Sequence, residues 1–340
     1  MPHLRILSAG PACTLQDAGR WGLLRYGVTP AGAMDWIARR EANAFAGNGP
    51  DMGVIEIGPG GLALAAFEGD VRIGLSATGF LPRIGETALP GRIAVTLGDD
   101  ETLTIRPGPS HVWAYLAVTG GFAVDPVLDS LSTHIRSGIG PFGGRALQTG
   151  DLLEVRAAPD VAVLPTMIAT GLAPADTDQP IRVIPGPQDD HFTDGALATF
   201  LSAGFTLSPQ SDRMGYRLTG PRIIHRAGHD IVSDGIAFGS VQVPGDGQPI
   251  VLMADRQPTG GYPKIATAIR ADLPRLAQMR AGDTLRFRAV TVDEAVAALT
   301  AATLSADAVR AAMVPLRTGP DLARLASGDF ASGFIDAKTP

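Results

Sequence analysis

The sequence predicts a mainly β protein built from two β-rich halves with a few short helices. Glycine (42) and proline (27) are both frequent among the 340 residues, which favours short strands joined by turns. Short apolar and β-branched runs recur between Gly, Pro or Asp pairs, as expected of strands. Residues 157–180 contain Pro165, Pro174 and a polar Asp-Thr-Asp run, so we expect a linker between the halves there.

The first half is expected to contain six strands and one helix. The strands are predicted at residues 3–7, 61–67, 71–75, 92–97, 102–105 and 112–118. The helix is predicted at residues 35–46, where apolar side chains can share one face. Asp35 suits its N-cap, and Gly47 suits its end.

The second half is expected to begin with a strand at residues 181–184 and a helix at residues 189–203, which Asp189 or Asp190 would cap. The remaining elements are four strands at residues 205–207, 216–219, 239–243 and 250–254, a hairpin turn at 244–249, a short helix at 272–280 and a closing strand at 284–289. We therefore expect domains at residues 1–160 and 178–291, followed by an alanine-rich, partly helical tail at 292–340.

Composition excludes several classes of protein. The hydrophobic fraction of 45% and charged fraction of 18% fit a globular protein with a large core. The net charge of -6, with no basic stripe, argues against a nucleic-acid partner. No apolar run approaches the ~20 residues that span a bilayer, and the N-terminus lacks a signal-peptide hydrophobic region. Cys13 is the single cysteine, so no internal disulfide can form. A cytoplasmic protein without a membrane partner is expected.

The segment 255–264, Asp-Arg-Gln-Pro-Thr-Gly-Gly-Tyr-Pro-Lys, holds the densest group of chemically active residues. It ends in Lys264, one of two lysines among 28 basic residues, and an ammonium is a compact charge that a guanidinium replaces poorly. Thr259, Gly260 and Gly261 could present backbone N–H groups to an anion. The alternative is a tight turn that carries a solvated lysine. The spacing does not fit a Walker A loop.

Three further loops contain candidate residues. Residues 14–22, with Gln16, Asp17 and Arg20, lead toward a helix N-terminus, where an anion is favoured; alternatively Asp17 and Arg20 pair with each other. Residues 186–192 contain Gln188 and a histidine that has no second histidine at ligand spacing, so no metal site is expected. Residues 211–217 contain Arg213, for which the alternative is a surface ion pair ahead of a strand.

Together these loops resemble the biotin-dependent carboxyltransferase-like family, also called allophanate hydrolase subunit 2-like or KipA-like, whose members are largely described as the C subunit of 5-oxoprolinase. The resemblance runs from about residue 4 to residue 290. It is carried by Thr14-Leu15-Gln16-Asp17, Gly19-Arg20, Gly22, Gly27-Val28, Gly32-Ala33-Met34-Asp35, Gly186-Pro187-Gln188-Asp189, Ser211-Asp212-Arg213-Met214-Gly215, residues 242–249 and Thr259-Gly260-Gly261-Tyr262-Pro263-Lys264. Pro258 departs from the pattern, because a hydroxyl residue is expected before Thr259.

The resemblance implies two cyclophilin-like β-barrel domains and a subunit of a heteromeric ATP-dependent 5-oxoprolinase, which opens 5-oxoproline to glutamate. The implied partners are a KipI-like (allophanate hydrolase subunit 1-like) companion, which shares the active site, and a LamB/YcsF-like subunit. ATP with Mg²⁺ is the implied cofactor. One alternative is a carboxyltransferase component that acts on urea or a similar amide. Another is a KipA-like regulator that sequesters a KipI-like kinase inhibitor. Neither lysine is flanked by methionines, so biotin would come from a separate carrier protein.

Both enzyme hypotheses require hydrogen-bond partners for a small amide or lactam and cations for an anionic oxygen. The resemblance and these requirements together give the candidate residues. As catalytic residues we expect Lys264, Asp17, Asp255 and Arg213. As substrate-binding residues we expect Gln16, Arg20, Gln188, Gln242, Gln257, Thr259, Gly260, Gly261 and Tyr262.

Overall fold

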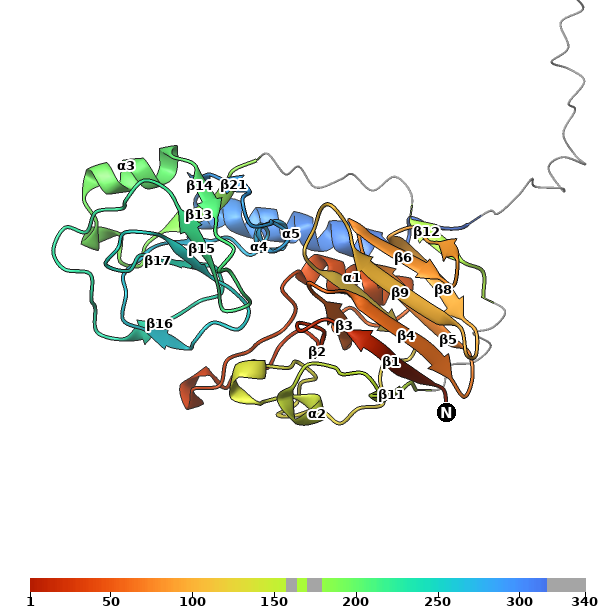
Figure 1. Cartoon of the computed structure of the whole chain (residues 1–340). Helices are drawn as coiled ribbons and strands as arrows, with labels where there is room; N and C mark the ends of the chain where they lie inside the picture. The colour runs from red at the N-terminus through yellow and green to blue at the C-terminus, as the bar shows by residue number, and fades with distance from the viewer. Residues whose placement is uncertain (157–163, 170–178, 317–340) are drawn as a thin grey trace, which may run out of the picture.

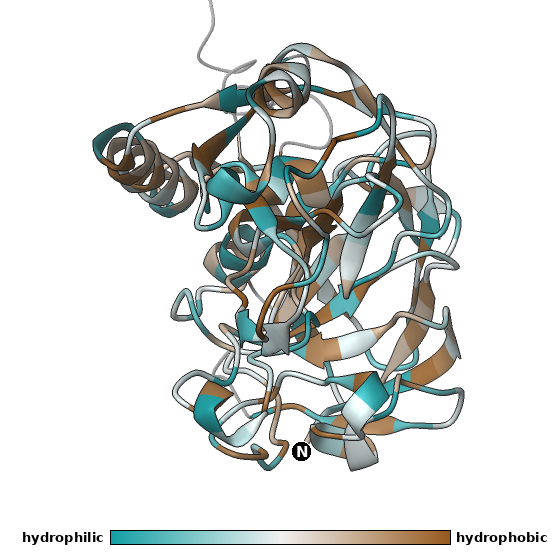
Figure 2. Ribbon diagram, turned by 90° about the vertical axis from the view of Figure 1, so that its left-hand side faces the viewer, coloured by the Kyte–Doolittle hydropathy of each residue, from teal (hydrophilic) through white to brown (hydrophobic). Residues whose placement is uncertain are grey.

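The computed structural model of this chain describes residues 1–156, 164–169 and 179–316, and it is mainly β, as predicted (Figure 1). The strands separate into two groups along the chain, and short helices lie around them. Apolar residues concentrate in the central strands, whereas the peripheral turns are mainly hydrophilic (Figure 2). Among the described helices, none combines the length and apolarity that a bilayer crossing requires.

The first half contains two antiparallel sheets that share one core. One sheet has the order β11-β1-β4-β9-β6-β7, with β1 (His3–Ala9), β4 (Leu62–Phe67), β6 (Phe80–Ile84), β7 (Thr87–Ala88), β9 (Thr102–Pro107) and β11 (Leu152–Glu154). The other has the order β2-β3-β10-β5-β8-β12-β23, with β2 (Thr14–Gln16), β3 (Val54–Ile57), β5 (Val71–Ser76), β8 (Arg92–Leu97), β10 (Ala114–Val118), β12 (Met167–Ala169) and β23 (Met313–Pro315). Alternate residues of β4 are buried, because successive side chains of a strand point to opposite faces.

The second half contains an eight-stranded sheet of order β21-β14-β15-β18-β17-β20-β13-β22. Its strands are β13 (Ile181–Pro185), β14 (Phe205–Leu207), β15 (Gly215–Thr219), β17 (Ser240–Gln242), β18 (Ile250–Leu252), β20 (Lys264–Ala268), β21 (Thr284–Leu285) and β22 (Phe287–Ala289). Among the described strands of this sheet, only β13 and β22 pair in parallel. A separate ladder joins β16 (Asp234–Gly235) to β19 (Thr259–Gly260). The core of this half continues into the first half, since Met34, Trp113 and Tyr115 belong to the same apolar cluster as Phe192 and Tyr216.

The predicted first helix is confirmed as α1 (Trp36–Phe45). The Asp35 carboxylate caps it by accepting a hydrogen bond of 2.9 Å from the backbone N–H of Ala38. The helix lies directly on β5 at Gly74. A Cβ atom at that position would come within 2.2 Å of the Ala42 carbonyl oxygen, so only glycine permits the close approach.

The other helices are α2 (Pro141–Gly144), α3 (Asp194–Ser202), α4 (Leu273–Ala277) and α5 (Val292–Ala308), with 3-10 turns η1 (Leu24–Tyr26), η2 (Ile135–Ser137) and η4 (Asp189–His191). The helix predicted over residues 189–203 is confirmed as α3, but its predicted start was wrong. Thr193 starts α3 instead, because its hydroxyl accepts from the backbone N–H of Ala196 at 3.1 Å. Asp189 and Asp190 therefore lie in η4 and do not cap α3.

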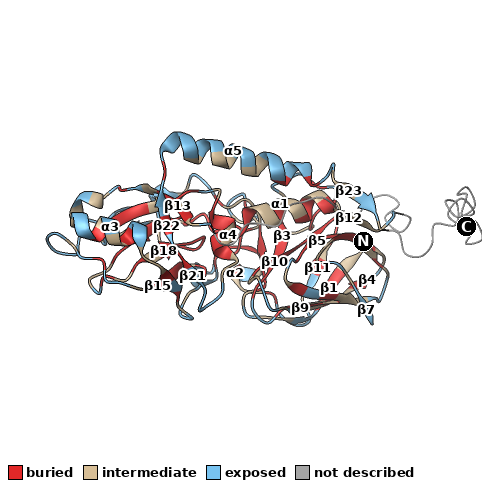
Figure 3. Cartoon of the chain, turned by 90° about the horizontal axis from the view of Figure 1, so that it is seen from above, coloured by how far each residue is buried: buried red, intermediate tan, exposed pale blue. Residues whose placement is uncertain are grey.

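The C-terminal segment returns to the first half. Helix α5 lies along the outside of the molecule, against α1 and β13 (Figure 3). Strand β23 then pairs with β12, which itself pairs with β8. The expected linker at 157–180 thus contains a strand at Met167–Ala169, while residues 157–163 and 170–178 lie outside the described residues. The domain limits given above stay predictions, and residues 317–340 of the tail also lie outside the described part.

Candidate functional site

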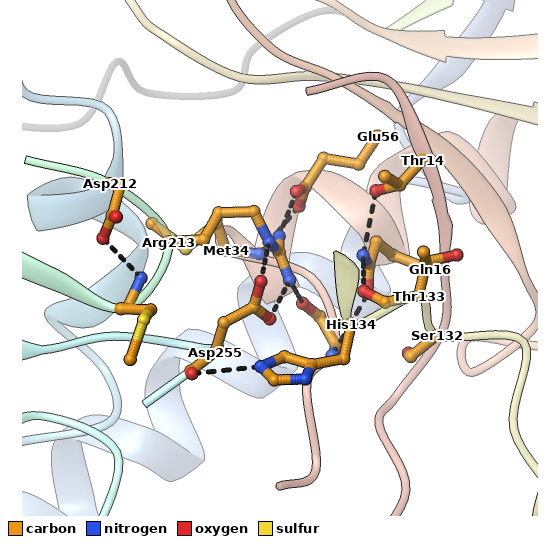
Figure 4. A network of polar contacts seen from close by, with 12 residues as sticks. Thr14, Gln16, Met34, Glu56, Ser132, Thr133, His134, Asp212, Arg213 and Asp255 are labelled. Atoms are coloured by element: carbon orange, nitrogen blue, oxygen red, sulfur yellow. Dashed lines mark hydrogen bonds and ion pairs between the residues drawn. The ribbon is translucent and has the colours of Figure 1, made fainter. Parts of the chain in front are cut away.

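A buried ionic network joins the two halves at Arg213 (Figure 4). The guanidinium donates through Nε and Nη2 to the Asp255 carboxylate, at 2.9 and 2.8 Å. It also donates through Nη1 to Glu56 on β3, and through Nη2 to the Gly32 carbonyl oxygen at 2.9 Å. Arg213 is 8% exposed and Glu56 is fully buried. The alternative of a surface ion pair at Arg213 is therefore wrong.

The turn before β15 fixes the direction of Arg213. The Asp212 carboxylate accepts hydrogen bonds from the backbone N–H groups of Met214, at 2.8 Å, and Gly215, at 3.2 Å. Such an Asx-type turn holds the backbone on both sides of Arg213. Burial lowers the pKa of the Arg213 guanidinium, but the carboxylates of Asp255 and Glu56 outweigh this effect and raise the pKa above its usual value. Arg213 is therefore a permanent buried cation.

Glu56 connects this network to the start of α1. Its Oε2 accepts from the Met34 backbone N–H and from the Tyr115 hydroxyl, both at 2.8 Å. The same hydroxyl accepts from the backbone N–H of Asp35 at 2.8 Å. On its other side, the Asp35 carboxylate accepts from Nε2 of Gln278, in the second half, at 2.9 Å. The loop that precedes α1 is thus held by both halves.

Asp17 and Arg20, both predicted site residues of the N-terminal loop, hydrogen-bond to residues 127–132 rather than to each other. The Asp17 carboxylate accepts from the hydroxyls of Ser130 and Ser132, at 2.7 and 2.6 Å, and from the backbone N–H of Leu131 at 2.6 Å. Arg20 donates instead to the carbonyl oxygens of Val127, at 3.0 Å, and Ser132, at 2.7 Å. The alternative in which Asp17 and Arg20 form an ion pair with each other is wrong.

Gln16 links this loop to the turn before the network. Its Nε2 donates to the Thr133 carbonyl oxygen at 2.9 Å, and its Oε1 accepts from the Gly32 backbone N–H at 3.2 Å (Figure 4). Since the Gly32 carbonyl accepts from Arg213, the structure brings Gln16, Arg213 and Asp255 into one region.

Lys264 belongs to a second cluster. Its side chain is 1% exposed, and Nζ donates to Oδ2 of Asp234 at 2.7 Å. Gln188 donates from Nε2 to the same oxygen at 2.9 Å and accepts from the Lys264 backbone N–H at 3.1 Å. Hydrogen bonding from Lys264, then from Gln188, lowers the pKa of Asp234 to about 2. The alternative of a solvated lysine on a turn is wrong, because Lys264 starts the interior strand β20.

The remaining predicted residues surround this second cluster. Thr259 and Gly260 form strand β19, so they are not the open turn that was expected. Gln242 is buried and donates to the Tyr262 carbonyl oxygen at 3.3 Å. Tyr262 is exposed, while Gly261 and Gln257 are partly exposed. Among the described residues, no hydrogen bond or ion pair joins the cluster at Lys264 directly to the predicted residues around Arg213.

Two partners in these clusters were missed. Glu56 has a recognisable signal, since a single carboxylate in the apolar strand Val-Ile-Glu-Ile requires a buried cation. Asp234 has none, because its strand β16 has only two residues and its contact with Lys264 is a tertiary one. Within the described ranges, no group of three His, Cys, Asp or Glu side chains is placed to hold a metal ion.

A small pocket opens between the loop before α1 and the second half. The first half contributes most of its wall, with Trp21, Trp36 and Arg39, and the second half contributes Phe238 and Arg270. The indole N–H of Trp36 donates to the Arg270 carbonyl oxygen at 3.1 Å and so fixes one wall. A pocket at such a junction is a usual place for a ligand.

Residues 26–289 match the family described as carboxyltransferase domain, subdomain A and B. The chain belongs to this family. The resemblance inferred from the loop motifs is thereby confirmed.

The chain is similar to three known proteins over most of its length. It is 37% identical over 290 residues to the 5-oxoprolinase C subunit of Haemophilus influenzae, an alignment that covers 85% of this chain and 92% of that protein. It is 32% identical to the solved TTHA0988, with a TM-score of 0.76, covering 85% of this chain and 55% of that one. The urea amidolyase of K. lactis, at 23% identity and a TM-score of 0.82, shares the fold over 94% of this chain and 21% of that one.

Proposed function

We propose that this protein is a subunit of a heteromeric ATP-dependent 5-oxoprolinase, which converts 5-oxoproline, ATP and water to glutamate. The 37% identity to a C subunit of 5-oxoprolinase, over nearly the whole of both chains, carries this proposal. The pocket at the junction of the two halves supports it, because its walls combine aromatic faces with guanidinium groups. A small lactam that bears a carboxylate presents matching apolar and anionic surfaces.

The buried network has a positioning role in this proposal. Arg213 is held by Asp255 of its own half and by Glu56 and Gly32 of the other, so it fixes the two walls of the pocket relative to each other. Rigid support of this kind keeps binding groups in place without touching substrate. Gln16, Asp17 and Arg20 support the wall formed by the N-terminal loop.

The cluster at Lys264 is proposed to supply donors for an anionic oxygen. The Asp234 carboxylate accepts from the ammonium and holds it beside Gln188, while Gln242 lies near Tyr262. An oxygen that gains negative charge during opening of the lactam would be stabilised by such donors. ATP with Mg²⁺ is proposed as the cofactor, shared with the companion subunit, and among the described residues no group of three His, Cys, Asp or Glu side chains is placed to hold a metal ion.

The proposed active site is shared with a KipI-like companion and a LamB/YcsF-like subunit, and the chain is proposed to be inactive alone. Exposed apolar side chains next to the pocket support a covering partner. Trp21 lines the pocket and is 51% exposed, and Tyr26, farther along the same segment between β2 and α1, is 66% exposed. Exposed aromatic residues of this kind are typical of interfaces.

Co-expression with the companion subunits, followed by an assay of glutamate release from 5-oxoproline, tests the proposal. ATP-dependent release by the complex, and none by the isolated chain, is the expected result. Carboxylation of urea by a complex supplied with a biotin carrier, without glutamate release, would favour the carboxyltransferase alternative. Tight binding of a KipI-like inhibitor without either turnover would favour the regulatory alternative.

A further inference from the structure

Arg39 has unsatisfied hydrogen-bond donors in the wall of the pocket. It lies on α1, is 3% exposed and donates from Nη2 to Asp51 at 2.9 Å. Its Nε and Nη1 atoms are buried and have no hydrogen-bond partner among the described residues. Burying such donors of a charged group without an acceptor is costly, so an acceptor that reached them would stabilise the folded protein.

A second guanidinium lines the same pocket. Arg270 lies 5.8 Å from the centre of the Trp21 ring, and its backbone is held by Trp36. Burial lowers the pKa of Arg270, and the nearby charge of Arg39 lowers it further, against the opposing effect of Asp51. Two cations thus share a region in which a bound anion would relieve their repulsion.

The acidic side chains around the pocket do not provide that anion. The Asp17 carboxylate lines the pocket but already accepts four hydrogen bonds, from Gly19, Ser130, Leu131 and Ser132. Asp51 is 63% exposed and pairs with Arg39 through a single oxygen. Asp35 is turned toward Gln278 and the N-terminus of α1.

We infer that this pocket is the carboxylate-binding subsite, in which one carboxylate of a small ring-shaped substrate bridges Arg39 and Arg270 and the ring packs against Trp21. The inference rests on the proposed function, which identifies that substrate as 5-oxoproline. A planar carboxylate offers two acceptor oxygens, which match the planar donor groups of guanidinium. The pocket is small, so it suits a single carboxylate better than a triphosphate. Urea carries no carboxylate and would gain nothing from this subsite.

Calorimetric titration of the full chain with 5-oxoproline, and with 2-pyrrolidinone as the same ring without the carboxylate, tests the inference. We expect binding of 5-oxoproline only, with affinity reduced at least ~10-fold in Arg270→Gln and in Arg39→Gln, since each loses a charge-assisted contact. Arg83→Gln is the control, because Arg83 lies on β6, pairs with Glu86 and does not line the pocket. Thermal unfolding of each variant checks the fold.

Several results would overturn the subsite. These are wild-type affinity in Arg270→Gln, equal binding of 2-pyrrolidinone, no binding of 5-oxoproline to the full chain, or competition by inorganic phosphate as strong as that by 5-oxoproline. The subsite and the proposed function can fail separately. A complex that releases glutamate with an unchanged KM in Arg270→Gln would retain the function and lose the subsite. Binding that depends on Arg270, in a complex without glutamate release, would retain the subsite and lose the function.

Discussion

Arg213 donates a hydrogen bond to Glu56 across the junction of the two halves, although 157 positions separate the two residues in the chain. Both side chains are buried, and Asp255 holds the other edge of the guanidinium. The attraction within a buried ion pair offsets the cost of removing its charges from water only when the geometry is good and the remaining donors are satisfied. Here the Gly32 carbonyl takes one of the remaining donors. The network therefore specifies how the halves sit on each other.

Glu56→Ala should strongly destabilise the protein. The substitution leaves Arg213 short of one carboxylate and removes the acceptor of the Met34 N–H and the Tyr115 hydroxyl. Breaking a buried pair in this way costs about 3–5 kcal/mol. Urea unfolding measures the loss. The control is Arg226→Ala, whose exposed pair with Asp194 should contribute below ~1 kcal/mol. A loss in Glu56→Ala no larger than in the control would contradict the structural role.

Elements that are set by neighbouring residues in the chain, such as a helix and its N-cap, could be predicted from the sequence. Helix α1 and its Asp35 cap follow from apolar spacing and one side chain, and both are confirmed. The start of α3 was misplaced because Asp189 and Asp190 also suit an N-cap, whereas the structure uses the Thr193 hydroxyl. Arg213 was singled out from its motif, but its burial depends on Glu56 of another sheet. No sequence pattern within a loop reports such a long-range pairing.

The contacts of Lys264 also could not be predicted from the sequence. Its unusual lysine was visible in the sequence, but Asp234 is 30 residues away in the two-residue strand β16. The pairing of β16 with β19 brings them together, and these strands have two residues each. Segments this short carry no periodicity that sequence analysis could detect.

Asp35→Asn should remove a pH dependence of stability. Burial raises the pKa of Asp35 from 3.8 to about 7, against the hydrogen bonds from Ala38 and Gln278 that lower it. The folded state therefore holds this proton more tightly than the unfolded state. The resulting stabilisation is complete below pH 3.8 and is lost as the pH rises through 7, a change on the order of 4 kcal/mol.

Urea unfolding of both proteins at several pH values checks this. Between about pH 4 and 7 the wild type should lose stability relative to Asp35→Asn, in which asparagine still caps α1. The new amide faces Nε2 of Gln278, and this contact changes the free energy of unfolding by an amount that does not vary with pH. A stability difference that stays constant across this range would refute the assignment.

Lys264→Met should reduce turnover of the assembled complex by ~100-fold, the effect of losing one charge-assisted contact to a developing anion. Methionine keeps most of the buried stem, so the fold should survive. Asp234→Asn separates this role from a structural one. If Lys264 serves only to pair with Asp234, the two variants should lose equal activity. If the ammonium contacts substrate, Asp234→Asn should retain most of the turnover, because an amide oxygen can still accept from Nζ. Kinetics and thermal unfolding of both variants decide the question.

Tyr26→Ala should weaken binding to the KipI-like companion. Tyr26 ends η1, is 66% exposed, and its ring lies 4.8 Å from the Arg25 guanidinium, an aromatic and arginine pair of the kind that dominates interfaces. Truncating such a residue costs about 2 kcal/mol, or ~30-fold in affinity. Biolayer interferometry with the immobilised companion measures the effect. Leu81→Ala is the matched control, because Leu81 is 56% exposed on β6, in a sheet that does not contribute to the pocket. Full affinity in Tyr26→Ala, together with weaker binding in Leu81→Ala, would move the interface away from the pocket and remove the structural support for a shared active site.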